Sequence, residues 1–372
     1  MRQIRVRFHL IMWQNIIIKK AYIGFFTVAV LLTGCGLSPK EQDSGPVFYP
    51  ALPNPPRIQH LLSITSLDDL TRSKSGFSDF LLGKKSTDSM ITKPYGIAVF
   101  DGKIYVVDAG RAGYGVLNLK TQKYKFVSGG AAGKMKKPIN ITIDKKGSKY
   151  ISDTGREQVL IFDRNDKFVR ALGIKGQFKP SDVAVTEERI FITDLNSHTI
   201  HVLDKFSDKL INQFGQVGSK EGEFYYPTNL SLGPDKLLYI TDTGNFRVQK
   251  FTQNGEFIRR YGSIGSGLGK FARPKGLTLD KEGRLYVVDA AFENVQVIDN
   301  KGKLLLYFGQ AGDKPADINL PADISIDYDN VKLFQPYAHP KFKLEYVILV
   351  SSQYGVNKIN VFGFGRMQGM EY

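Results

Sequence analysis

One proline recurs along this chain at nearly fixed distances, and an alternating apolar run follows each copy within three residues. The copies begin at Pro94, Pro138, Pro180, Pro227, Pro274 and Pro321, at intervals of 44, 42, 47, 47 and 47 residues. A period of this length with several strand patterns per copy is typical of β-propellers, in which each repeat forms one blade. The spacing therefore predicts six blades.

Each copy contains four runs with strand character. In the fifth copy they are residues 276–280, 284–288, 295–298 and 304–308, separated by breaks rich in Gly, Asn and Asp. Period-two alternation with β-branched residues favours strands, and such breaks favour hairpin turns. No stretch of the body keeps a helical period over a dozen residues. We therefore expect an all-β fold of four-stranded antiparallel blades with almost no helix.

The two ends of the repeat region predict how the ring closes. The sixth copy ends soon after residues 361–365, so it lacks a fourth strand, and it carries a long insertion around Tyr328–Leu344. A strand pattern at residues 57–64 precedes the first proline and resembles the fourth strands of other copies. We expect this N-terminal strand to complete the last blade, which removes an open sheet edge.

A second landmark is an Asp that ends the second strand of five copies, 14 or 15 residues after the proline. These residues are Asp108, Asp153, Asp194, Asp242 and Asp289, and the sixth copy has Ser351-Ser352 instead. Five equivalent carboxylates favour a structural role over a catalytic one, because an Asp at this point can accept backbone N–H groups and fix the turn.

The segments Lys93–Val99, Tyr225–Leu230 and Asp242–Phe251 resemble the NHL repeat, and the resemblance extends over about residues 57–365. It implies a six-bladed propeller. It also implies a binding face made by the loops before the first strand and between the second and third strands, which NHL propellers use to bind protein or RNA.

The first 34 residues have the order of a secretory signal. Five Lys and Arg residues and no acidic residue precede or flank an apolar stretch, Ala21–Leu32, which is too short to span a bilayer. Leu32-Thr33-Gly34-Cys35 then resembles the bacterial lipobox, in which the Cys is acylated, and Cys35 is the only Cys of the chain. We expect a signal peptide at 1–34, a Pro-rich tether at 35–56 and the propeller at 57–372.

The predicted location and the net charge limit the classes of binding partner that we expect. Net charge is +15, and removing residues 1–34 leaves +10. Basic charge attracts anionic groups, but export argues against nucleic acid. We expect a monomer that is lipid-anchored in the cell envelope and binds an envelope protein, a peptide or an anionic glycan. Gly36, in place of an Asp after the Cys, favours the outer membrane.

The predicted loop face gathers aromatic and basic residues, which on a rigid scaffold often form binding surfaces. The candidates are Tyr95, Arg111, Tyr226, Phe246, Arg247, Arg273, Lys275 and Phe292, with Tyr114, Arg156, His198 and Tyr354 beside them. An alternative is that Phe246 and Phe292 pack between blades.

The position two residues after each proline predicts a second candidate site, at the mouth of the central channel. It holds Gly96, Asn140, Asp182, Asn229, Gly276 and Asp323. The oxygens of Asn140, Asp182, Asn229 and Asp323 could hold Ca²⁺, or they could bond channel water and the turns. We expect no cofactor, with Ca²⁺ as the alternative. Zinc is disfavoured, because the spacing of His198 and His201 points them to opposite faces of a strand.

These observations favour a membrane-tethered binding scaffold that is not an enzyme. Two alternatives stay open. One is a Ca²⁺-dependent lyase or lactonase with its site in the channel, and the other is a structural subunit of an envelope secretion, polysaccharide-export or redox assembly.

Overall fold

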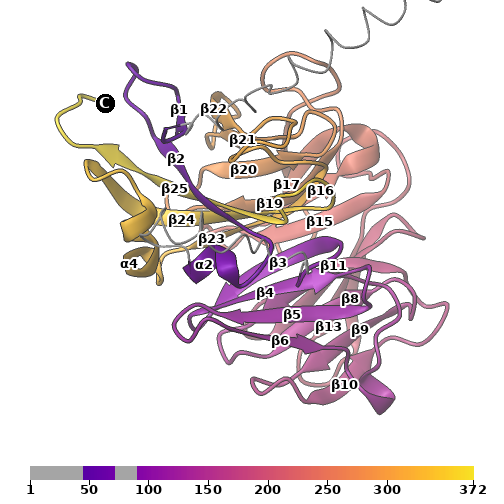
Figure 1. Ribbon diagram of the computed structural model, residues 1–372. Coiled ribbons are helices and arrows are strands. Elements are labelled where there is room, and N and C mark those ends of the chain that lie inside the picture. Colours follow the sequence, from indigo (N-terminus) through magenta and orange to yellow (C-terminus); the bar gives the residue numbers. More distant parts are fainter. Residues whose placement is uncertain (1–44, 72–89) are drawn as a thin grey trace, which may run out of the picture. The chain divides into compact units, whose positions relative to one another are not determined.

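The computed structural model describes residues 45–71 and 90–372, and Pro46–Tyr372 form one compact unit. Its strands form six antiparallel sheets (Figure 1). In five of them, four strands that are consecutive in the sequence lie side by side. The predicted six-bladed β-propeller of four-stranded blades is thus confirmed. Within the described ranges, no helix is both long enough and apolar enough to cross a bilayer.

The first five blades each take four consecutive strands. Blade 1 has β3 (Pro94–Phe100), β4 (Lys103–Asp108), β5 (Gly113–Asn118) and β6 (Lys123–Val127); blade 2 has β7 (Pro138–Ile143), β8 (Lys149–Asp153), β9 (Gln158–Phe162) and β10 (Phe168–Leu172). Blade 3 has β11 (Pro180–Val185), β12 (Arg189–Asp194), β13 (Thr199–Asp204) and β14 (Leu210–Phe214); blade 4 has β15 (Pro227–Leu232), β16 (Leu238–Asp242), β17 (Arg247–Phe251) and β18 (Phe257–Tyr261). Blade 5 has β19 (Pro274–Leu279), β20 (Leu285–Asp289), β21 (Asn294–Ile298) and β22 (Leu304–Phe308).

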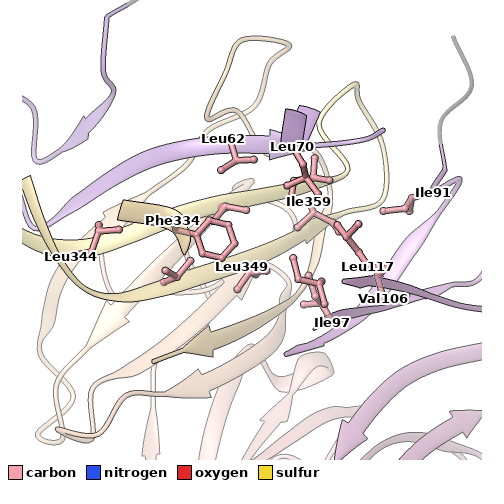
Figure 2. Packing of buried hydrophobic residues seen from close by; sticks show 14 of the residues in the cluster. Leu62, Leu70, Ile91, Ile97, Val106, Leu117, Phe334, Leu344, Leu349 and Ile359 are labelled. Carbon is pink, nitrogen blue, oxygen red and sulfur yellow. The ribbon is translucent and has the colours of Figure 1, made fainter. Parts of the chain in front are cut away.

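The sixth blade is closed by the N-terminal strand, as predicted. It contains β23 (Pro321–Asp327), β24 (Phe342–Ser352), β25 (Ile359–Met367), β2 (Ile58–Ile64) and β1 (Phe48–Tyr49). Strand β2 pairs with β25 from Ile58 opposite Phe364 to Ile64 opposite Ile359. Figure 2 shows the apolar core at this closure, where Leu62 of β2 lies with Leu349 and Ile359 of blade 6.

Strand β1 lies inside the segment that the sequence predicts as a tether. Phe48 is buried and packs against Phe342, with ring centroids 5.7 Å apart. The compact unit therefore starts at Pro46, ahead of the residue 57 predicted from the repeats, because this short strand buries an aromatic side chain.

The insertion in the sixth copy is partly helical. It forms α4 (Val331–Phe334) and η3 (Gln335–Tyr337), and Phe334 packs into the core shown in Figure 2. The other helical turns described are α2 (Asp68–Thr71), η1 (Ala131–Gly133) and η2 (Thr243–Asn245).

The first strand of every blade lies innermost, and these six strands contact one another in sequence around the central channel. Each begins at its proline, which pairs with the last residue of the second strand. The register then shifts just after the proline in all six blades. Such bulges re-aim residues locally, and here they fall at the channel mouth.

Candidate functional site

We call the end of the propeller where the six inner strands begin the entry face. Two sets of residues repeat there, three positions apart. The residues two after each proline form the channel ring, which is Asn140, Asp182, Asn229 and Asp323, with Gly96 and Gly276 at the remaining positions. The residues one before each proline are Lys93, Lys137, Lys179, Tyr226, Arg273 and Leu320.

The channel ring is held together by backbone hydrogen bonds. The N–H of Ile97 in blade 1 donates to Oδ2 of Asp323 in blade 6 at 2.9 Å. In blade 3, Asp182 accepts the N–H of Val183 at 2.7 Å and that of Leu230 from blade 4 at 3.0 Å. Both carboxyl groups therefore satisfy inner-strand N–H groups of their own or the next blade, which would otherwise be left unpaired.

The amides and glycines of this ring are equally tightly placed. Asn140 accepts the N–H of Ile141 at 2.9 Å. A Cβ at Gly96 would lie 2.6 Å from the Cα of Asn140, and one at Gly276 would lie 2.4 Å from the Cα of Asp323. Only glycine fits where neighbouring backbones approach so closely. The sequence-predicted residues do meet in one ring, and that ring is largely filled.

The channel carboxyl groups hold protons more tightly than usual. Burial raises the pKa of Asp323 to about 7. Burial and the nearby Asp323 raise the pKa of Asp182 well above its ordinary value, although hydrogen bonds from Leu230, Val183 and Asn229 oppose this shift. Two buried carboxyl groups that influence each other do not both ionise readily.

This arrangement fits Ca²⁺ poorly, because that ion takes six to eight oxygen ligands. The carboxylate oxygens of Asp182 already accept two N–H groups, and Asn229 Oδ1 is the ring oxygen that is buried without a partner among the described residues. Within residues 45–71 and 90–372, no three His, Cys, Asp or Glu residues cluster closely enough to hold a metal ion.

A cavity of about 210 Å³ lies beyond the ring, inside the channel. Its walls include the hydroxyl groups of Thr142, Ser231, Thr278 and Ser325, and Asp182 and Asp323 stand at its border. The polar side chains of the lining are hydroxyl and carboxyl groups and the amide of Asn140, and none of them is a cation.

The positions before the prolines carry four cations on the entry face: Lys93, Lys137, Lys179 and Arg273, which we call the basic ring. Among the described residues none of the four makes an ion pair or a side-chain hydrogen bond; Lys93 Nζ lies 5.4 Å from the ring centroid of Tyr354. The sequence prediction included Arg273 and missed the three lysines. The sequence does contain a pattern that could have predicted them, because a basic residue precedes four of the six repeated prolines.

The nearest repeated carboxylates are engaged elsewhere. Asp108 accepts N–H groups from Thr92, Lys93, Gly110 and Arg111 at 2.7–3.3 Å. Asp153 and Asp289 bond the equivalent backbone of their blades. The predicted structural role of these residues is confirmed. Because their oxygens bind backbone, they do not pair with the side chains of the basic ring.

Two further polar side chains stand without partners at the channel mouth. Lys275, the second residue of β19, is only 8% exposed and makes no side-chain hydrogen bond or ion pair among the described residues. Burial, with the nearby charge of Arg273, lowers the pKa of Lys275 to about 8. Tyr95, the second residue of β3, is half-buried. The pKa of its hydroxyl group is raised, mainly by burial; the charge of Arg273 opposes this shift, and Asp323 adds to it. Both were predicted as loop-face residues, and both belong to the mouth.

Tyr226 takes the place of a cation between Lys179 and Arg273. It is 47% exposed, and its ring lies 4.8 Å from both Tyr225, itself 44% exposed, and His198. His198 stacks on Tyr225 at 5.5 Å with rings nearly parallel, and its Nδ1 accepts the N–H of Tyr226 at 2.8 Å. We call His198, Tyr225 and Tyr226 the aromatic platform.

Two of the predicted surface residues are in fact buried. Arg247 is 3% exposed, because its guanidinium binds Asp242 at 2.9 Å and the carbonyls of Ser219, Lys220 and Glu223. It fastens the loop ahead of β15 and is not available to a ligand. Tyr114 is fully buried in the contact of blades 1 and 2, and its hydroxyl donates to Asp166 at 3.0 Å.

The remaining loop-face candidates are divided. Phe246 packs partly into the core of blades 4 and 5, in line with the alternative of packing between blades, and Phe292 is half-buried. Arg111 is exposed, but its guanidinium donates to the carbonyl of Met90 at 2.9 Å and lies over the ring of Phe126. Arg156 binds the carbonyls of Ala132 and Lys134. These residues hold the rim together and leave the mouth to the basic ring.

The two histidines considered for zinc serve separate purposes. His198 supports Tyr226, whereas His201 Nε2 lies 3.1 Å from Asp194 Oδ2 on the other side of the strand end. The predicted lipid-attachment residue, Cys35, lies outside the described residues.

Comparisons with known proteins support the architecture. A family model described as "6-bladed beta-propeller" matches residues 233–362. The fold is also that of a gluconolactonase from Xanthomonas campestris (14% identity, TM-score 0.56, covering 86% of this chain and 94% of that one) and of an auxiliary nutrient binding protein from Bacteroides ovatus (13%, 0.58, 82% and 76%). By fold, the chain is a six-bladed β-propeller.

A curated relative corrects one expectation from the sequence. A probable peptidyl-alpha-hydroxyglycine alpha-amidating lyase from Caenorhabditis elegans is 33% identical over 161 residues, which are 37% of this chain and 45% of that protein. The chain thus matches less than half the length of this relative. Because this relative is named as a lyase and the structural neighbour is named as a gluconolactonase, the expectation that the protein is not an enzyme does not stand.

Proposed function

We propose that this propeller binds an acidic ligand at the mouth of its channel. The observation that carries the proposal is the basic ring: four cations from four blades at one end of the inner strands, without an acidic partner in the described part of the chain. Lys275 adds a fifth cation in a partly desolvated position, where charge–charge attraction is stronger than in bulk water. The nutrient-binding propeller of the same fold supports a binding role.

The test compares cations at the two ends of the same blades. A Lys179→Gln/Arg273→Gln variant should bind acidic probes, such as a polyuronate and polyglutamate, about tenfold more weakly than the native protein. The control is Lys209→Gln/Lys301→Gln, which removes two exposed charges from the loops at the opposite end of blades 3 and 5. Affinity should also fall with added salt. Equal losses in both variants would show only a general charge effect and would refute the site.

A second candidate function is base-catalysed elimination, favoured by Lys275. An amine with a pKa of about 8 is partly unprotonated near neutral pH and can accept a proton. With the carboxylate of a substrate held by the basic ring, Lys275 Nζ would take the proton from the carbon next to the carboxyl group. The electron pair of that C–H bond forms a double bond as the group on the adjacent carbon leaves with its own bonding pair. The lyase named among the relatives supports this class.

Substitution of Lys275 tests this second function. Lys275→Gln should abolish formation of the unsaturated product while an acidic ligand still binds, and the native rate should rise with pH toward the pKa of the amine. Conversion at the native rate by Lys275→Gln would eliminate Lys275 as the base.

We also propose that the repeats are of the NHL type and that the propeller is tethered to the outer membrane through acylated Cys35. The proline and Asp landmarks support the first statement, and the basic, apolar and Leu32–Cys35 segments support the second. Cys35→Ser should release the protein from membrane fractions or leave an unprocessed precursor. Unchanged processing and partition would refute the tether.

A further inference from the structure

The aromatic platform differs from the other exposed apolar side chains in being rigidly built. Three rings lie within 5.5 Å of one another, and a hydrogen bond from the Tyr226 backbone to His198 fixes the centre. Tyr226 also has φ 55°, a conformation that non-glycine residues rarely adopt. Thirteen other non-glycine residues of the described chain also have a positive φ, so the ring contacts and the hydrogen bond, and not the backbone conformation, distinguish the platform.

The platform is continuous with the basic ring. Tyr226 occupies the same repeat position as Lys179 and Arg273, one blade away on either side. A chain of hydroxyl groups links it to the Lys275 strand: Thr228 Oγ1 lies 2.6 Å from Thr243 Oγ1, which donates to the carbonyl of Pro274 at 2.8 Å. In the order of the blades, Tyr226 therefore lies between two cations of the basic ring.

We propose that the acidic ligand is a saccharide, with one sugar ring stacked on Tyr226 and its carboxylate directed to Lys179 or Arg273. This rests on the proposed binding function and names its ligand class. An aromatic ring has a negative face that attracts polarised C–H groups, such as those on one side of a pyranose. The rim of the same sugar carries hydroxyl and carboxyl groups, which suit the cations and hydroxyls around the platform.

An acidic peptide fits these features less well. Apolar peptide anchors are bound best in closed, desolvated pockets, whereas both tyrosine rings of the platform are nearly half exposed. A rigid, open ring surface bordered by charges is better suited to a flat, polar-edged ligand, and its rigidity lowers the entropy cost of binding.

The experiment uses an array of uronic-acid-containing oligosaccharides, the matching neutral oligosaccharides, and acidic peptides. We expect the acidic saccharides to bind. Tyr226→Ala should weaken acidic and neutral saccharides by the same factor, about tenfold or more, and Tyr226→Trp should retain binding. Lys179→Gln/Arg273→Gln should weaken only the acidic ones. The control is Phe206→Ala, which removes a 76% exposed ring from the opposite end of blade 3 and should change nothing.

Three results would overturn the inference. If the acidic saccharides bind and the charge variant weakens them, but Tyr226→Ala does not, the platform is wrong and the proposed function stands. If acidic peptides bind and saccharides do not, the ligand class is wrong. If no acidic probe binds, the proposed function fails as well. Melting curves of each variant establish that it is folded.

Discussion

Two rings of polar residues lie at the same end of this propeller, and they differ in what satisfies them. In the channel ring, Asp182 and Asp323 accept backbone N–H groups, and two glycines are needed for the ring to close. In the basic ring, the side chains of Lys93, Lys137, Lys179 and Arg273 make no ion pair and no hydrogen bond in the described structure, and Lys93 lies near the ring of Tyr354. The first ring serves the fold, and we propose that the second binds a ligand.

The difference follows from the repeat itself. The bulge after each proline turns inner-strand N–H groups toward the channel, and a short acidic or amide side chain two residues after the proline can reach them. At the position one residue before the proline, the backbone N–H is bound by the Asp that ends the second strand. The side chain at this position is therefore not needed for the turn and is free to vary. Polar residues near a channel therefore do not by themselves indicate a binding site. Whether their polar atoms are already hydrogen-bonded within the protein determines whether they are available to a ligand.

The largest expected effect is from filling the channel ring. Gly276→Ala places a Cβ 2.4 Å from the Cα of Asp323, so a backbone must move, and we expect the free energy of unfolding to fall by about 3 kcal/mol. Gly267→Ala, whose Cβ would have its nearest neighbour at 4.0 Å, is the control and should melt like the native protein. Equal melting of the two variants would show that the ring is loosely packed.

The next effect is a pH dependence of stability. The pKa of Asp323 is about 7 in the folded protein, above the unfolded value of about 4, so the folded state binds more protons between these values. Stability is then greatest below the unfolded pKa and falls as pH rises through 7, by about 3 kcal/mol between pH 5 and 8. Chemical denaturation from pH 5 to 8 measures this loss.

Asp323→Asn is the matched variant for this prediction. The amide can still accept the N–H of Ile97 but does not ionise, so the fall in stability should become shallower. A slope that is the same in both proteins would assign the pH dependence to other groups.

The sequence predicted the fold well because its signals are local and repeated. The proline intervals, the strand alternation and the missing last strand required no knowledge of distant contacts. The channel ring could also be placed, since equivalent positions of a propeller meet around its axis. Arg247 and Tyr114 could not, because their burial depends on loop carbonyls and on an Asp far along the chain.

The basic ring was missed for a different reason. In the sequence, a lysine before a proline cannot be distinguished from any other solvated surface charge. Only the structure shows that these lysines have no acidic partner among the described residues and are therefore candidates for ligand binding. Alignment of the residues just before the six prolines would have shown the pattern. Tyr225 was also left out, because its stacking on His198 joins two blades.

A smaller effect concerns the stability of the basic ring. Lys179→Gln/Arg273→Gln removes no hydrogen bond or ion pair among the described residues, so the free energy of unfolding should change by less than about 0.5 kcal/mol. Urea denaturation checks this value. A loss comparable to that of Gly276→Ala would mean that the ring supports the fold.

The smallest effect should come from calcium. The channel ring presents few free oxygens, so millimolar Ca²⁺ should shift the melting temperature by less than about 1 °C, because only a ligand that binds the folded state tightly stabilises it. Chelator-treated protein is the reference. A shift of several degrees that is lost in Asn229→Ala would show that the ring does hold the ion.

The most direct test is a crystal structure of residues 36–372 with a uronic-acid-containing oligosaccharide. We expect the sugar on the entry face, with a carboxylate bound by Lys179 or Arg273 and a ring against Tyr226. A saccharide bound instead in the cavity between Thr142 and Ser325, or at the opposite end of the blades, would contradict it.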